Sequence, residues 1–362
     1  MNHYLDILQK PNAKVLITGD SLSYNRYSYY EEPHMNAYEC GVSMPSWSFR
    51  VRDKIYALDS QIIFGSDISF NQSGAVGVDD PDADKYAAAF DGKCYTVSAK
   101  DDVSFEVNIK SDTLAFYFQT RPANYCTFDL FVDGELAAEN IDTKGDAEFF
   151  KGYAILPVKA RCNEDVSRHK IELRNIKGEN PKITVGAVGA KYIDINLTGR
   201  GSQTTRFFID NFDERIGRFA PDFLLIILSA NDRGHVAPEV MRKDLLELFA
   251  KIFKVNKDCK ILFLLPPHSH FGSKPHMDSG IYSSIDTANV YNTVIRDVIA
   301  NLGKAWYKHP DLDGDINYDI DILAVCDLFE TENPSEWRFD NIHLNQNGNN
   351  VLFEAVCDKL GI

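Results

Sequence analysis

The chain has 362 residues, 44% of them hydrophobic and 12% aromatic, which is enough to bury the cores of two domains and excludes a disordered chain. A formal net charge of −15 argues against nucleic acid or an anionic membrane as a partner. No apolar stretch is long enough to span a bilayer, and residues 1–10 lack a signal-peptide core. Seven scattered cysteines are typical of free thiols, so we expect a cytoplasmic protein, although a secreted chain without its signal peptide would look the same.

The first informative segment is an apolar strand at residues 15–18 that leads into the turn Gly19-Asp20-Ser21-Leu22. A serine in this turn lies at the carboxyl edge of a sheet, where α/β enzymes present their reactive groups. A serine is a poor nucleophile at neutral pH unless a base lies beside it. Because Gly, Asp and Ser also form ordinary surface turns, the other segments must decide between the two interpretations.

A helix is expected at residues 46–58, and between residues 66 and 190 the chain then changes to short segments of alternating apolar and polar residues. Such segments, separated by turn signals such as Asp133-Gly134, predict an antiparallel β-sandwich. We therefore expect a first domain at residues 1–65 and 191–362, interrupted by a jelly-roll-like domain at residues 66–190. The expected strands are Tyr95–Ser98, Val103–Ile109, Leu114–Thr120, Thr127–Val132, Tyr153–Val158, His169–Asn175 and Lys182–Val188.

After the insertion, strands and helices alternate again, which predicts a parallel sheet with helices on both faces. Six apolar residues at 223–228 suit a strand buried on both sides, and this strand leads to Asn231. The Asn231 carboxamide could stabilise an oxyanion without adding charge, or it could belong to a simple turn. Further strands are expected at residues 260–267 and 320–328, and further helices at residues 241–255, 289–302 and 348–359.

Two residues near the C-terminus, Asp340 and His343, are three positions apart in a short loop. Asp340 can accept a hydrogen bond from one imidazole nitrogen of His343, which leaves the other nitrogen to take the proton of Ser21. The segment also has the features of a helix N-terminus, because Asn345 and Asn347 precede an amphipathic helix. Both interpretations can hold together, since the start of a helix anchors a loop well.

Four segments of the chain resemble, in the same order, the four blocks of the GDSL/SGNH hydrolases. They are Gly19-Asp20-Ser21-Leu22, Gly201, Ser229-Ala230-Asn231-Asp232 and Asp340-Asn341-Ile342-His343. The third block departs from the family, with Ser229 where glycine is commoner. The resemblance implies that Ser21 is the nucleophile, His343 the base and Asp340 the residue that orients it. It also implies an oxyanion hole formed by the N–H groups of Ser21 and Gly201 and the side chain of Asn231, with Gly199 as a rival to Gly201.

This resemblance implies a three-layer α/β/α sandwich with a parallel sheet, and a serine esterase that needs no metal and no cofactor. The hairpin signal at Asp133-Gly134 also resembles one in the jelly-roll domain of certain carbohydrate esterases. We therefore expect the substrate to be a small acylated molecule, an acetylated carbohydrate above all, and a homo-oligomer is compatible with the sequence. The alternatives are a lipase-like or thioesterase-like enzyme and a non-catalytic glycan-binding protein, and the β-sandwich could be a lid or a dimer contact.

Three groups of residues carry weaker signals. His268, His270 and His276 follow an expected strand, but their spacing favours a substrate-lining loop over a zinc site. Residues 311–315 resemble a calcium loop but have glycine at the wrong position. Four tyrosines after Ser21, namely Tyr24, Tyr27, Tyr29 and Tyr30, could stack on sugar rings or simply pack in the core.

Overall fold

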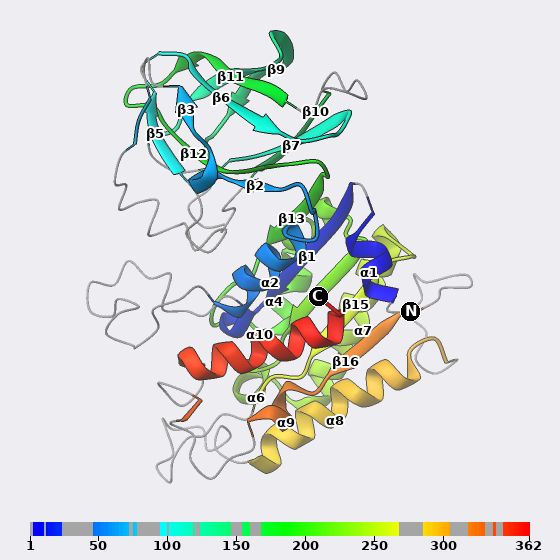
Figure 1. The fold of residues 1–362 in the computed structure, drawn as a ribbon. Helices are drawn as coiled ribbons and strands as arrows, with labels where there is room; N and C mark the ends of the chain where they lie inside the picture. The colour runs from blue at the N-terminus through cyan, green and yellow to red at the C-terminus, as the bar shows by residue number, and fades with distance from the viewer. Residues whose placement is uncertain are drawn as a thin grey trace. The chain divides into compact units, whose positions relative to one another are not determined.

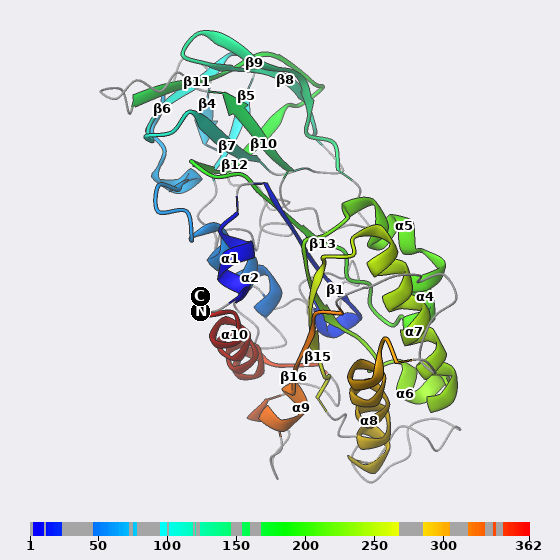
Figure 2. The ribbon, with the colours of Figure 1, turned by 90° about the vertical axis from the view of Figure 1, so that its right-hand side faces the viewer.

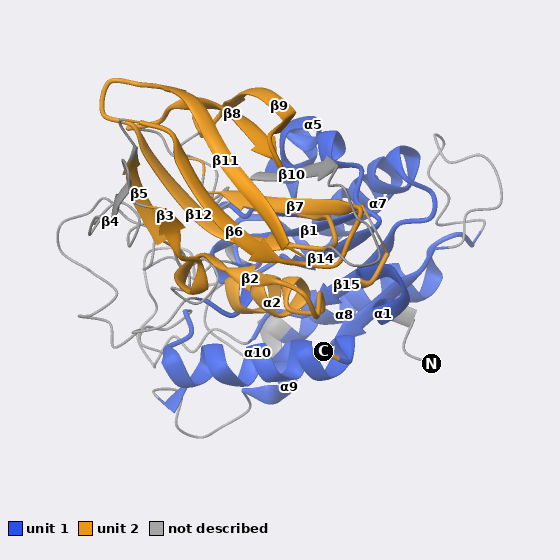
Figure 3. Cartoon of the chain, turned by 45° about the horizontal axis from the view of Figure 1, so that its top comes forward, with its two compact units in different colours: residues 1–8, 13–48, 195–361 blue, residues 9–12, 49–194, 362 orange. Residues whose placement is uncertain are grey.

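The structure is a computed structural model, and Figure 1 shows its ribbon. It describes residues 3–10, 12–23, 46–71, 75–77, 95–99, 101–118, 120, 124–145, 154–159, 168–267, 285–304, 318–329, 336–337 and 343–362. The chain divides into two compact units, coloured separately in Figure 3. Unit 1 comprises residues 1–8, 13–48 and 195–361, and unit 2 comprises residues 9–12, 49–194 and 362. The division expected from sequence, with boundaries at 65/66 and 190/191, stays a prediction about the folding domains.

The core of unit 1 is a five-stranded parallel sheet in the order β13-β1-β14-β15-β16. The central strand β14 is parallel to both of its neighbours, with Ile17 paired to Leu225 and Leu225 paired to Leu262. Every residue of β14 is buried, which explains why its sequence is continuously apolar and does not alternate. The strands are β1 (Ala13–Gly19), β13 (Ile193–Leu197), β14 (Phe223–Ile227), β15 (Lys260–Leu264) and β16 (Ile320–Leu323).

Helices cover both faces of this sheet, as Figure 2 shows. On one face, alternate strand residues such as Leu16, Leu224 and Ile261 pack in one apolar cluster with Phe249 and Ile295 from the helices. The helices on this face are α4 (Thr205–Asp210), α5 (Phe212–Arg215), α7 (Pro238–Val255) and α8 (Ile285–Asn301). On the other face lie α1 (His3–Leu8) and α10 (Gln346–Leu360). The predicted parallel α/β fold is therefore confirmed.

The remaining helical segments are short or join the larger elements. They are α2 (Trp47–Tyr56), α6 (Asp232–His235), α9 (Val325–Leu328), η1 (Ser21–Ser23), η3 (Gly65–Asp67) and η5 (Gly217–Phe219). The strands predicted at residues 260–267 and 320–328 were too long at their C-terminal ends, because they end at Leu264 and Leu323. Residues 325–328 form the helical turn α9, because a short apolar run does not distinguish a strand from a buried helical turn.

Unit 2 is an antiparallel β-sandwich of two sheets. One sheet has the order β10-β7-β12-β5-β4 with β2 added to β12, and the other has the order β3-β6-β11-β8-β9. Phe116 of β7 meets Phe128 of β8 edge to face, with ring centres 6.3 Å apart, so the two sheets share one apolar core. The strands are β2 (Ile63–Phe64), β3 (Phe70–Asn71), β4 (Ala75–Gly77), β5 (Tyr95–Ala99), β6 (Val103–Asn108), β7 (Thr113–Phe118), β8 (Thr127–Val132), β9 (Glu135–Asp142), β10 (Ala154–Lys159), β11 (Arg168–Lys177) and β12 (Lys182–Gly189).

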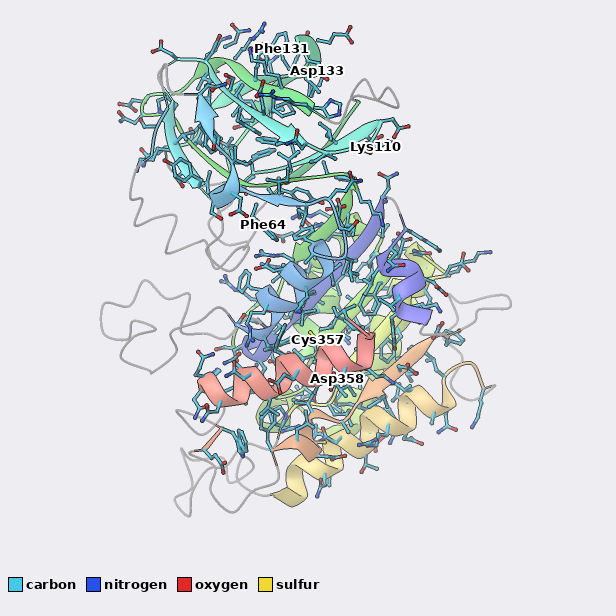
Figure 4. All side chains as sticks on the ribbon, viewed as in Figure 1. Phe64, Lys110, Phe131, Asp133, Cys357 and Asp358 are labelled. Carbon is cyan, nitrogen blue, oxygen red and sulfur yellow. The ribbon has the colours of Figure 1, made fainter. Side chains whose placement is uncertain are left out.

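The predicted hairpin at Asp133-Gly134 is present and joins β8 to β9, with Val132 paired to Glu135. Both turn residues have a positive φ, +52° at Asp133 and +80° at Gly134, as a two-residue turn of this kind requires. The Asp133 carboxylate also accepts the Lys170 N–H and contacts the buried His169 ring, which fixes the hairpin to β11 (Figure 4). The jelly-roll connectivity of the sandwich stays a prediction.

Candidate active site

The turn after β1 is shaped by a close approach between two strands. Gly19 has a φ of +142°, and a Cβ atom at this position would lie 1.9 Å from the carbonyl oxygen of Ile227 in β14. That same oxygen accepts the N–H of Asp20 at 3.1 Å. A residue without a side chain is therefore required at position 19, and the chain turns sharply enough to begin η1 at Ser21.

Ser21 and His343, which are 322 residues apart in the sequence, meet at this turn. The distance between Ser21 Oγ and His343 Nε2 is 3.0 Å, and each residue is only 4% exposed. This distance allows His343 to take the serine proton. The neighbouring Ser23 has a different role, because its hydroxyl donates to the backbone oxygen of Asp20 at 2.7 Å. Of the two serines in the turn, Ser21 is thus the one placed beside a base.

Besides Ser21, the residues proposed for an oxyanion hole lie in two turns at the same edge of the sheet. The loop after β13 is held against β1, because the Arg200 N–H donates to the oxygen of Gly19 at 2.8 Å, and the buried Gly201 follows directly. Asn231, at the N-terminus of α6, donates from Nδ2 to the oxygen of Gln203 in that loop at 3.1 Å. This bond uses one of the two hydrogens of the Asn231 amide. Gly199 lies in the same loop, so the choice between the two glycines stays a prediction.

The carboxylate of Asp20 connects the turn after β1, which carries Ser21, to the turn after β14, which carries Asn231. Its Oδ1 accepts the N–H of Leu22 at 3.0 Å, and its Oδ2 accepts the N–H of Ala230 at 3.2 Å. Asp232 makes a similar connection, because its carboxylate accepts both the N–H and the hydroxyl of Thr205 at 3.1 Å. The turns after β1 and β14 and the start of α4 are therefore joined by two buried carboxylates.

Burial changes the ionisation of both carboxyl groups. It raises the pKa of Asp20 to about 7; the N–H groups of Leu22 and Ala230 oppose this rise, and the charge of Asp232 adds to it. Burial likewise raises the pKa of Asp232 to about 6, opposed by the two hydrogen bonds from Thr205. In both cases the loss of water around the charged form outweighs the hydrogen bonds that favour it.

Ser229 occupies the position where the GDSL/SGNH hydrolases that the sequence resembles more often have glycine. The backbone conformation of Ser229 is one that favours glycine. Its φ is +90°, a conformation that glycine adopts without strain and that L side chains rarely adopt. Its hydroxyl is fully buried, and none of the described residues forms a hydrogen bond with it. Ser229 therefore combines backbone strain with an unsatisfied buried group next to the site.

The segment that carries His343 is fixed at the start of α10. Asn345 is the N-cap residue, and its Oδ1 accepts the N–H of Gly348 at 3.0 Å. The Asn345 N–H donates to the oxygen of Trp337 at 2.9 Å, and a Cβ atom at Gly348 would lie 2.3 Å from that oxygen. The start of α10 and the segment that carries His343 are therefore held together. This agrees with the sequence features of a helix N-terminus next to His343. Asp340 lies outside the described residues, so its role as the orienting residue stays a prediction.

The other candidate residues from the sequence also lie outside the described ranges. These are Tyr24, Tyr27, Tyr29, Tyr30, His268, His270 and His276, together with residues 311–315. Among the residues that the structure does describe, no group of three or more His, Cys, Asp or Glu could hold a metal ion. None of the helices in those ranges has the length and apolar character needed to cross a membrane.

No protein-family model matches the chain, and no curated protein sequence matches it. Among solved structures, a peptidoglycan O-acetylesterase is similar over 99% of this chain and 94% of its own, at 10% identity and a TM-score of 0.40. A putative GDSL-like lipase from Parabacteroides merdae covers 47% of this chain and 73% of its own, at 14% identity and a TM-score of 0.37. A catalytic mutant of an acetylxylan esterase from Geobacillus stearothermophilus has the same coverages, at 16% identity and a TM-score of 0.35. These likenesses concern the fold.

The strain at Ser229 gives a prediction for stability. We expect Ser229→Gly to raise the free energy of unfolding by about 1 kcal/mol, because it removes both the strained side chain and the unsatisfied hydroxyl. Ser229→Ala removes the hydroxyl but keeps the Cβ atom, so it should raise the free energy of unfolding by less than Ser229→Gly does. Urea denaturation of the three proteins measures the difference, and a Ser229→Gly variant less stable than Ser229→Ala would contradict this account.

The raised pKa values predict how stability changes with pH. An aspartate in an unfolded chain titrates near pH 3.9, so between about pH 4 and pH 7 the folded protein keeps a proton on Asp20 that the unfolded chain releases. This contribution is fully present below about pH 4 and is lost as the pH rises through about 7, by about 1.4 kcal/mol per pH unit for one proton.

Asp20→Asn should therefore show a smaller fall in unfolding free energy between pH 5 and pH 7 than the wild-type protein does. Its absolute stability should be lower, because an amide can accept only one of the two backbone N–H groups. Urea denaturation at several pH values gives the slope of unfolding free energy against pH for the wild-type protein and for Asp20→Asn. Equal slopes would show that Asp20 does not hold its proton in the folded state.

Proposed function

We propose that this protein is a serine ester hydrolase that works through an acyl-enzyme. The observation that carries the proposal is the contact between Ser21 Oγ and His343 Nε2 at 3.0 Å, made between two buried residues at the carboxyl edge of a parallel sheet. A serine in contact with an imidazole is the arrangement that nucleophilic catalysis requires. Asn231 lies in a neighbouring turn that Asp20 joins to the turn of Ser21, which supports its proposed role as a neutral donor to the oxyanion.

In the proposed reaction, Ser21 Oγ attacks the carbonyl carbon of the ester while His343 Nε2 takes the serine proton. The negative oxygen of the tetrahedral intermediate is stabilised by the N–H groups of Ser21 and Gly201 and by the Asn231 side chain. His343 then gives its proton to the departing alcohol, which leaves the acyl group on Ser21. Water attacks this acyl-enzyme with His343 again as base, and the acid is released. Asp340 is proposed to hold the imidazole in the tautomer that these steps need.

For the substrate, we propose a small acyl group, acetyl above all, on a carbohydrate. This finer proposal is supported by the resemblance of the sequence blocks and by the β-sandwich of unit 2, with its hairpin at Asp133-Gly134. The net charge of −15 suits a neutral substrate better than an anionic polymer such as nucleic acid.

The nucleophile assignment predicts that Ser21→Ala lowers kcat for p-nitrophenyl acetate by about 10⁴-fold or more, because it removes the hydroxyl that lies 3.0 Å from His343 Nε2. Ser23→Ala is the matched control: it removes a serine hydroxyl from the same turn and should keep kcat within a few-fold. Steady-state kinetics with unchanged circular dichroism tests this. Full activity in Ser21→Ala would overturn the assignment.

The substrate proposal predicts a preference for short acyl chains. In a series of p-nitrophenyl esters, kcat/KM should be highest for acetate and should fall as the chain lengthens. Acetate release from acetylated xylan, mannan, peptidoglycan and simple sugar acetates then identifies the alcohol. A preference for octanoate or longer esters would instead favour a lipid or thioester substrate.

A further inference from the structure

Two buried side chains lie near the candidate active site without taking part in the proposed chemistry. Trp47 is the first residue of α2, and Asn349 lies in the first turn of α10. Both have an exposed fraction of 0%. Each carries polar atoms that must find partners when buried, so their hydrogen bonds show what they hold in place.

Trp47 connects the nucleophile turn to Asn349. Its indole Nε1–H donates to the backbone oxygen of Leu22, the residue after Ser21, at 2.8 Å. Its backbone N–H donates to Oδ1 of Asn349 at 3.2 Å. One end of this residue is therefore fixed to η1, and the other end is fixed to a side chain of α10.

Asn349 continues the connection to the base segment. Its Nδ2 donates to the backbone oxygen of Leu344 at 3.1 Å and to that of Asn345 at 3.0 Å. Leu344 directly follows His343 in the chain. The contacts therefore form a closed ring: on one side His343 meets Ser21, and on the other side Asn349 and Trp47 connect the residues that follow each of them.

We propose that Trp47 and Asn349 are positioning residues that set the distance between Ser21 Oγ and His343 Nε2. The nucleophile lies in a three-residue 3-10 helix and the base lies just before a helix N-terminus, so neither backbone segment alone fixes the distance between them. A displacement of about 1 Å at a catalytic group can cost about 10²-fold in rate. The effect on turnover rests on the proposed function, whereas the effect on the Ser21–His343 contact does not.

The contact itself is tested by NMR of the His343 imidazole, whose Nε2 chemical shift depends on its hydrogen-bond partner. The proteins to compare are wild type, Ser21→Ala, Trp47→Phe and the double variant, at one pH. We expect Ser21→Ala to change the Nε2 shift in the wild-type background and to change it by less than half as much in the Trp47→Phe background. An equal change in both backgrounds, or none in the wild-type background, would overturn the proposal.

Trp337→Phe is the matched control for the loss of an indole. The Trp337 side chain packs against Phe329 with ring centres 6.1 Å apart, and its Nε1–H forms no hydrogen bond with any residue that the structure describes. It lies beside the same base segment, so it reports the effect of removing an indole there without removing a hydrogen bond of the ring. We expect the full Ser21→Ala shift change in this background. A change reduced as much as in Trp47→Phe would contradict a specific role for Trp47.

Turnover gives the second measurement. Asn349→Asp keeps the acceptor for Trp47 and removes both donors, whereas Asn350→Asp places the same change one residue further along α10 as a control. For p-nitrophenyl acetate we expect Trp47→Phe and Asn349→Asp to lower kcat about tenfold to a hundredfold with KM within about twofold, and Asn350→Asp to change neither.

The two measurements separate the two proposals. If wild-type protein does not hydrolyse the ester, the proposed function fails, and the NMR comparison still decides whether Trp47 positions the pair. If the protein is an esterase and Trp47→Phe keeps full kcat, the positioning proposal fails alone. If Asn349→Asp does not fold, Trp47→Phe carries both measurements, because it leaves most of the buried ring in place.

Discussion

The site depends on one buried carboxylate, that of Asp20. Parallel strands end at a common edge of the sheet, but this alone brings turns near one another without fixing their geometry. Asp20 supplies the missing constraint, because it accepts the N–H of Leu22 in the nucleophile turn and the N–H of Ala230 in the turn before Asn231. The turns that carry Ser21, the proposed nucleophile, and Asn231, the proposed oxyanion donor, are thereby held by the same side chain.

Burying these groups at the edge of the sheet lowers the stability of the folded protein. A fully buried carboxylate is unfavourable, as its raised pKa shows, and Asp232 adds a second negative group nearby. Ser229, whose φ is +90°, lies in the turn after β14 directly before Ala230. Strain and buried charge gathered at one edge are typical of sites where the geometry of reacting groups matters more than stability. Apolar burial in β14, which is buried throughout, and in β1, where every residue except Lys14 is buried, offsets these costs.

Much of the fold could be predicted because its elements have clear periodicity. In β8 every second residue is buried, and all seven strands expected between residues 95 and 188 are present. The sequence did not indicate β9, an edge strand with one buried residue and several acidic ones, so it shows neither alternation nor an apolar run. The short strands β2, β3 and β4 have two or three residues, too few for a period to appear.

The sequence singled out Ser21, Asn231 and His343 because their residue types suit a nucleophile, an oxyanion donor and a base, and the structure brings Ser21 and His343 into contact. The supporting residues could not be found in this way. Trp47 looks like any apolar residue at a helix start, and Asn349 is one of four asparagines between residues 345 and 350. Their proposed role rests on hydrogen bonds from Trp47 to Leu22, 25 residues away, and to Asn349, 302 residues away, which no local pattern encodes. A signal was present for Ser229, because it departs from the glycine usual at that place, but the positive φ behind it needs the structure.

The central claim, that His343 activates Ser21, is tested most directly by covalent labelling. The protein is treated with a fluorophosphonate, which reacts with activated serines, and the modified peptide is mapped by mass spectrometry. Our account predicts one adduct on Ser21, and its loss in a folded His343→Ala variant. An adduct on Ser23 or on any other serine in place of Ser21, or labelling of Ser21 that persists without His343, would contradict it.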